Sequence, residues 1–246
     1  MSRTINDAII GAIVGNILGI DSIRLQDALP SDEVKHDVEH YIQNSQVLSV
    51  MSDIIRSIKK NDGFQIDDIR NKIESNDAMV NYIKAHGPCG VILCWVYLAA
   101  FNDIFIDHET FDSTVKQICQ ISYDDDVAIN VCIEYCHLLH DIFCHHIDID
   151  GIVKILPELD DILAGDVPIK RGIRAVFRAG LWAFVHSTDY KSAIENCRHL
   201  EYSDEFTNWI STVAGTLAGL YYGADSIPKE MIYDYKIDEY LEGRTF

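Results

Sequence analysis

The clearest hydrophobic pattern in the chain lies between residues 174 and 223, where two apolar helices flank a polar stretch. The first helix is expected to bury a set of large side chains, namely Val176, Phe177, Leu181, Trp182, Phe184 and Val185. The sequence Ser-Thr-Asp at 187–189 interrupts the pattern and supplies residue types that favour a helix N-cap. We therefore expect a helix over Tyr190–Leu200 and a second apolar helix from about Asn208 to Tyr222.

Glycines recur at every fourth position of two apolar helices, one over Thr4–Leu18 and the other ending near Tyr222. Residues four apart share one face of a helix, and glycine on that face lets a neighbouring backbone approach closely. The apolar run from Trp209 to Tyr222 is too short to span a bilayer. The pattern predicts close helix crossings inside the protein at two glycine sets, which are Gly11, Gly15 and Gly19, and Gly215, Gly219 and Gly223.

Turn and cap signals divide the rest of the chain into further helices. Ser31 or Asp32 can cap one helix, and Asp67 is a plausible cap for a helix through Ile73. An apolar helix is expected over Val91–Phe101, and the aspartates at 124–126 read as the cap and dipole complement of a long helix that follows. The pattern predicts a compact all-α protein with one domain over residues 1–246.

The long helix over Val127–His146 is rich in cysteine and histidine. Cys132, Cys136 and His140 share one face at i, i+4 and i+8, so a zinc site is one interpretation. One helix does not easily wrap three tetrahedral ligands around one ion, because i and i+8 lie about 12 Å apart. Buried cysteines with a histidine cluster at the helix C-terminus are the simpler interpretation, and we favour it.

Composition excludes several classes of partner. With 246 residues, 48% of them hydrophobic, the chain has the composition of a packed globular protein. Its formal charge of −19 argues against a nucleic-acid partner and against an anionic membrane surface. A chain this acidic favours a basic protein partner or a cation site. The alternative is that the negative charge serves only the solubility of the protein.

The expected location is the cytoplasm. Seven cysteines, several of them inside apolar helical patterns, fit reduced thiols better than a disulfide framework. The apolar run from Ala8 to Ile20 has the length of a signal-peptide core, but Asp7 precedes it, Asn16 interrupts it and no A-x-A-like cleavage site follows.

Several segments, in order along the chain, resemble the ADP-ribosylglycohydrolase family. The first helix has the family's G-x-x-x-G-D-A-L-G glycines, with Asn16 in place of the aspartate. The apolar helices of 174–223 resemble the family's C-terminal signature, and Ile227-Pro228 resembles the end of its last helix. The resemblance implies an all-α fold and, in active members, a pair of Mg²⁺ ions used to release ADP-ribose.

The positions that bind the metal ions in the family carry other residues here. The family's T-D-D-T becomes Ile42, Gln43, Asn44 and Ser45, and its G-G-D-x-D-T loop reads Asp204, Glu205, Phe206, Thr207, Asn208 and Trp209. In the pocket segment G-N-G-A-A-M-R, Gly87 matches the family. Mg²⁺ takes oxygen ligands and usually at least one carboxylate, whereas amide oxygens contribute no charge. We expect no catalytic residues and no metal cofactor; the alternative is a Mg²⁺ site that uses Asp204 and Glu205 after a shift of the loop.

The resemblance implies a function in ADP-ribosylation. Our leading hypothesis is a catalytically degenerate member that acts by binding a protein, for example an immunity protein that neutralises a basic ADP-ribosyltransferase toxin. The first alternative is an active hydrolase that removes ADP-ribose with substitute metal ligands. The second is a structural or regulatory protein that keeps only the fold.

Overall fold

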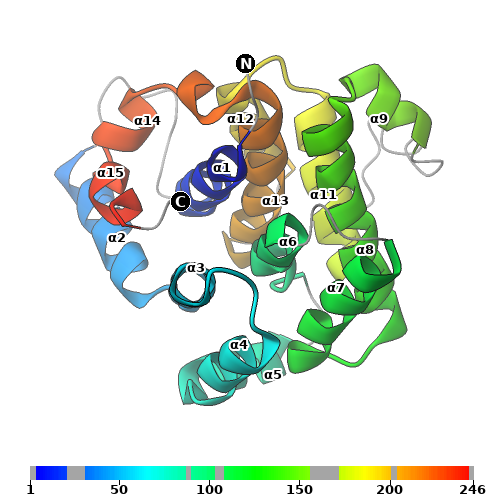
Figure 1. Ribbon diagram of the computed structural model, residues 1–246. Coiled ribbons are helices and arrows are strands. Elements are labelled where there is room, and N and C mark those ends of the chain that lie inside the picture. Colours follow the sequence, from blue (N-terminus) through cyan, green and yellow to red (C-terminus); the bar gives the residue numbers. More distant parts are fainter. Residues whose placement is uncertain are drawn as a thin grey trace.

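The computed structural model describes residues 4–20, 31–86, 90–102, 108–155, 172–200 and 204–243. Within these ranges the chain forms helices and turns and no strand, which confirms the all-α prediction (Figure 1). The helices of the first half are α1 (Ile5–Leu18), α2 (Asp32–Asn44), α3 (Gln46–Asn61), α4 (Ile66–Glu74), α5 (Asp77–His86), α6 (Leu93–Asn102) and α7 (His108–Ser122). Those of the second half are α8 (Asp126–His140), the π-helical turn η1 (Asp141–His145), α9 (Ile149–Ile155), α11 (Ile173–Val185), α12 (Tyr190–Arg198), α13 (Asp204–Tyr222), the 3₁₀ turn η2 (Ala224–Ser226), α14 (Glu230–Tyr233) and α15 (Ile237–Leu241).

The fold is centred on the crossing of α1 and α13, which other helices surround (Figure 1). The predicted glycine contact is confirmed here, because a Cβ atom on Gly11 would collide with the carbonyl oxygen of Gly215 and lie 2.8 Å from the Cα atom of Gly219. A Cβ atom on Gly15 would likewise collide with the carbonyl oxygen of Ser211. Because real Cβ atoms do not approach backbone this closely, only glycine permits the two helices to pack at this separation. The prediction is wrong for Gly223, which follows the end of α13 and has nothing within 4 Å of a Cβ position.

Two long-range hydrogen bonds hold this crossing in place. The Tyr190 hydroxyl donates to the carbonyl oxygen of Gly11 at 2.7 Å. Asp7 closes a capping box with Thr4 at the start of α1, and its other carboxylate oxygen accepts a hydrogen bond from the backbone N–H of Ala224 at 2.8 Å. The first helix is therefore fixed to segments about 200 residues further along the chain.

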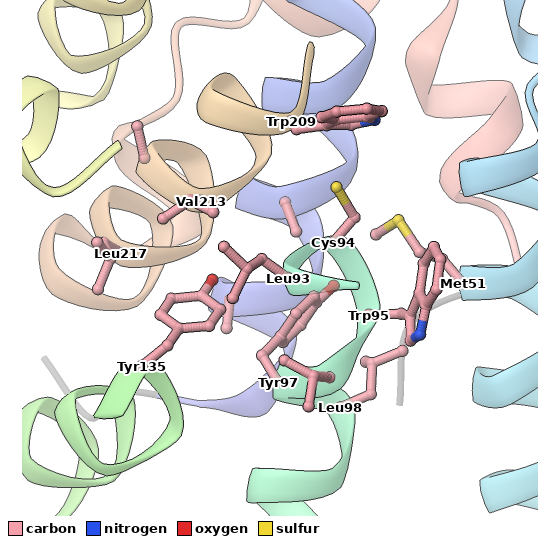
Figure 2. Close-up of a cluster of buried hydrophobic side chains, with 14 of the residues drawn as sticks. Met51, Leu93, Cys94, Trp95, Tyr97, Leu98, Tyr135, Trp209, Val213 and Leu217 are labelled. Carbon is pink, nitrogen blue, oxygen red and sulfur yellow. The ribbon is translucent and has the colours of Figure 1, made fainter. Parts of the chain in front are cut away.

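The aromatic part of the core lies around α6. Figure 2 shows Trp95, Tyr97 and Leu98 of α6 among side chains of the neighbouring helices, including Met51 of α3 and Tyr135 of α8. All five are at most 1% exposed. Burying large aromatic groups contributes strongly to stability.

The longest apolar helical stretch is Asp126–His145, formed by α8 and η1. Among the described residues it is the one helix whose length and composition would suffice to cross a bilayer, which the sequence analysis did not anticipate. Half of its most apolar window is buried by the rest of the protein. Packing against α6, α7 and α11 thus accounts for much of its apolar character.

The predicted caps are mostly confirmed. Ser31, Asp125 and Asp189 accept hydrogen bonds from backbone N–H groups of α2, α8 and α12. The prediction for Asp67 is wrong, because α4 begins at Ile66, so that Asp67 lies inside the first turn and forms an ion pair with Arg70. The helix expected from Asn208 begins one turn earlier, at Asp204.

Substituting Gly11 with alanine should destabilise the protein by about 3 kcal/mol, because the added methyl group forces α1 and α13 apart. The free energy of unfolding from urea denaturation measures this effect. Gly151→Ala is the control, since a Cβ atom there meets only the flexible side chains of Asp148 and Ile147. Equal stability of the two variants would contradict the role given to the crossing.

Candidate functional site

A polar cluster lies where α1, α13 and the end of α2 meet, and Asn16 is at its centre. Asn16 is fully buried within the otherwise apolar stretch 8–18 of α1. Its amide nitrogen donates a hydrogen bond to the Thr212 hydroxyl of α13 at 2.9 Å. Its amide oxygen accepts a hydrogen bond from the Tyr41 hydroxyl of α2, also at 2.9 Å. Both ends of the Asn16 side chain are thus bonded to other helices.

Tyr41 connects the cluster to the end of α2. Burial of its hydroxyl raises the pKa of Tyr41 to about 12, and the side chains of Ser45, Asn208 and Asn16 only partly offset this effect. The phenol therefore stays protonated at neutral pH and acts as a hydrogen-bond donor. It supplies no negative charge to the cluster.

Ser45 and Asn208 lie beside Tyr41, the first at the end of α2 and the second one turn into α13. Ser45 lies between α2 and α3, and its hydroxyl oxygen accepts a hydrogen bond from the backbone N–H of Leu48 at 3.3 Å as the N-cap of α3. Asn208 is 7% exposed, and none of the described residues donates a hydrogen bond of ordinary geometry to its buried amide oxygen. Its backbone carbonyl accepts a hydrogen bond from the Thr212 hydroxyl at 2.7 Å.

The structure thus brings three of the predicted site positions together, namely Asn16, Ser45 and Asn208. Gln43 and Asn44 are exposed instead. The side-chain amide of Asn44 donates to the carbonyl oxygen of His40 in its own helix at 2.8 Å. The difference arises because α2 continues to Asn44, so that successive residues point in different directions around the helix axis.

The remaining predicted positions lie elsewhere or are not described. Phe206 is partly buried and its ring packs against Trp209 at 5.0 Å, while Thr207 is 9% exposed. Asp204 and Glu205 form the first turn of α13, but their side chains lie outside the described part of the structure. Gly87 also lies outside the described residues.

A cleft of about 480 Å³ opens between α2 and the C-terminal segment. Gln43 is the one predicted site residue in its lining. The lining carries both signs of charge, from Asp32, Lys35, Glu39, Lys236 and Glu239. Such a mixed lining favours no single class of charged ligand.

Sequence reasoning missed Tyr41 and Thr212. Each was detectable by spacing, because Tyr41 precedes Ser45 by four residues and Thr212 follows Asn208 by four. Residues four apart share a helix face, so a polar residue at that spacing from a predicted site position is a candidate for the same cluster.

Comparison with known proteins identifies the fold. No protein-family model and no curated protein sequence matches the chain. Among solved structures, the chain is similar to one described as an ADP-ribosylglycohydrolase-related protein complex, with a TM-score of 0.69 and 16% sequence identity. The match covers 97% of this chain and 94% of the other. The chain therefore has an ADP-ribosylglycohydrolase-like, all-α fold over nearly its whole length.

Replacing Tyr41 with phenylalanine should lower the free energy of unfolding by about 1–3 kcal/mol, because it leaves the buried amide oxygen of Asn16 without its donor. Urea denaturation measures the change. Tyr233→Phe is the matched control, since Tyr233 is 58% exposed and should lose almost nothing. A loss at Tyr41 no larger than at Tyr233 would show that the cluster does not contribute to stability.

Proposed function

We propose that this protein is a catalytically degenerate ADP-ribosylglycohydrolase-like protein that acts by binding another protein. The observation that carries the proposal is the bonding of Asn16 to both Tyr41 and Thr212. The family's first helix carries an aspartate at this position, and here it is a buried, neutral amide with both ends engaged. The fold is retained while the chemistry at this position differs.

The donor set of the cluster does not suit Mg²⁺. The oxygen of Asn16 already accepts from Tyr41, and the hydroxyl oxygen of Ser45 already accepts from Leu48. Tyr41 remains a neutral phenol, so the cluster has no anion to offset the cost of removing water from the ion. Within the cluster, the amide oxygen of Asn208 is buried without a donor of ordinary geometry among the described residues, and one neutral oxygen does not replace several carboxylates. We derive no catalytic step from this cluster.

The charge of the chain supports a basic protein as the partner. A net charge of −19 on 246 residues produces a strong negative field, which favours rapid association with a basic surface. An ADP-ribosyltransferase toxin in the same cytoplasm, with this chain as its immunity protein, fits both the fold and the charge. In this role the protein blocks the toxin directly and does not reverse its product.

Release of ADP-ribose from an arginine-ADP-ribosylated protein tests the enzymatic part of the proposal. We expect no release with Mg²⁺ or with EDTA, while an active ADP-ribosylglycohydrolase releases ADP-ribose with Mg²⁺ under the same conditions. Mg²⁺-dependent release would overturn the proposal. Loss of that release in the Asp204→Asn and Glu205→Gln variants would then establish the alternative, a hydrolase with substitute carboxylate ligands.

Binding to a basic ADP-ribosyltransferase encoded beside this protein tests the partner. We expect a stable complex whose association rate falls at least tenfold between about 50 and 300 mM NaCl, because salt screens the attraction between opposite charges. Surface plasmon resonance measures the rate, and an acidic protein of similar size is the control. Absence of any complex with such a neighbouring protein, or absence of such a gene, would contradict the immunity role.

A further inference from the structure

The π-helical turn η1, which follows α8, places three side chains with metal-binding atoms on one side of the chain. One carboxylate oxygen of Asp141 lies 3.8 Å from Nδ1 of His140 and 3.8 Å from Nε2 of His145. The two imidazole rings pack edge to face with centroids 5.7 Å apart. All three potential ligand atoms lie within 4.8 Å of one another.

The π-helical geometry is what creates this group. In an α-helix, residues i and i+5 are rotated by about 140° and point away from each other. A π-helical turn closes between i and i+5 and brings such residues to the same side. His140 and His145 have this spacing, and the turn that joins them is the π-helical segment Asp141–His145.

The turn is held by the rest of the fold. Ile142 is completely buried, and η1 packs against α8 and α13. His146 ends the turn in the left-handed conformation, with φ of 52°. The three side chains are thus presented by an anchored segment.

Solvent can reach the group from one side. The His140 side chain is 18% exposed, Asp141 is 34% exposed and His145 is 64% exposed. An ion can therefore enter past His145 and reach the more buried His140. The group lies at the end of α8 and in η1, before α9 in the chain, and Figure 1 shows α8 and α9 on the side of the molecule away from α2.

We propose that His140, Asp141 and His145 bind a divalent transition-metal ion of the zinc type. Two imidazoles and one carboxylate suit Zn²⁺ or Co²⁺, whereas Mg²⁺ prefers oxygen ligands alone. Zinc–ligand bonds of about 2.0–2.1 Å in a tetrahedron place ligand atoms about 3.3 Å apart, so small side-chain rotations close the 3.8 Å separations. The fourth position of the ion remains open to water or to an external ligand.

The site differs from the zinc interpretation of the sequence. Only His140 belongs to both sets. Cys132 and Cys136 are fully buried in α8, two turns and one turn before His140 respectively, and burial raises the pKa of both thiols well above the ordinary value. They therefore stay protonated, whereas a thiol binds a metal ion as the thiolate.

The competing explanation is that the two histidines only complement the end of the helix dipole and pair with Asp141. That explanation requires no saturable binding of metal ions. It also predicts that replacing His145 changes metal-ion binding no more than replacing His146, which is next to it and also exposed. These two differences determine the experiment.

Isothermal titration of the tag-free, metal-stripped full chain with ZnCl₂ should show one saturable site. His145→Ala and Asp141→Asn should each weaken Zn²⁺ binding at least tenfold. His146→Asn is the matched control and should bind like the wild type, because asparagine tolerates the left-handed conformation. Binding that is weak and unsaturable, or equal in all four proteins, would overturn the proposal.

Two further measurements separate loss of a ligand from loss of folding. CoCl₂ should produce a visible absorption band typical of tetrahedral Co²⁺ in the wild type and in His146→Asn, but not in His145→Ala. Hydrogen exchange should show Zn²⁺-dependent protection of residues 141–146 in the wild type and in His146→Asn but not in His145→Ala, with unchanged protection of α1 and α13 in His145→Ala. Protection without the absorption band, or the band without dependence on His145, would contradict the assigned ligand set.

Discussion

The close crossing of α1 and α13 is the constraint on which the rest of this structure depends. Two helices can approach until their backbones touch only if the facing positions lack side chains, and the glycines of α1 and α13 meet that condition. The short distance between the two backbones also determines which side chains fit between α1 and α13 beyond the glycines. Asn16 and Thr212 bond directly, side chain to side chain, because the crossing holds their helices at hydrogen-bonding distance. The polar cluster is thus a consequence of the glycine contact next to it.

The polar cluster shows how a buried amide side chain is satisfied inside this fold. A buried asparagine is costly unless each end finds a partner, and the hydroxyls of Tyr41 and Thr212 satisfy both ends of Asn16. Under the proposed function, these neutral hydrogen bonds stand where the family has an aspartate. The three helices α1, α2 and α13 are connected through Asn16 by uncharged groups.

Much of the fold could be predicted from the sequence, because glycine spacing and cap residues act locally. The contact between the glycine sets, the capping residue Asp189 and the all-α class all follow from such patterns. The site was less predictable, because it depends on where a helix ends. The family motif is continuous in sequence, but α2 runs through Gln43 and Asn44, so that only Ser45 of this motif turns toward Asn16 and Asn208. The π-helical turn had no local signal either, since the sequence 141–145 reads as a simple continuation of α8.

The bonds between α1 and the C-terminal helices also have a consequence for biosynthesis. The partners of Asn16 and Gly11 lie 196 and 179 residues further along the chain, so α1 emerges from the ribosome long before α12 and α13 exist. Until then, α1 lacks α13, the helix against which most of its apolar surface packs. Nascent chains of this protein therefore depend on chaperones or on temporary contacts with the other early helices, and a chain that stops before α13 cannot complete its core.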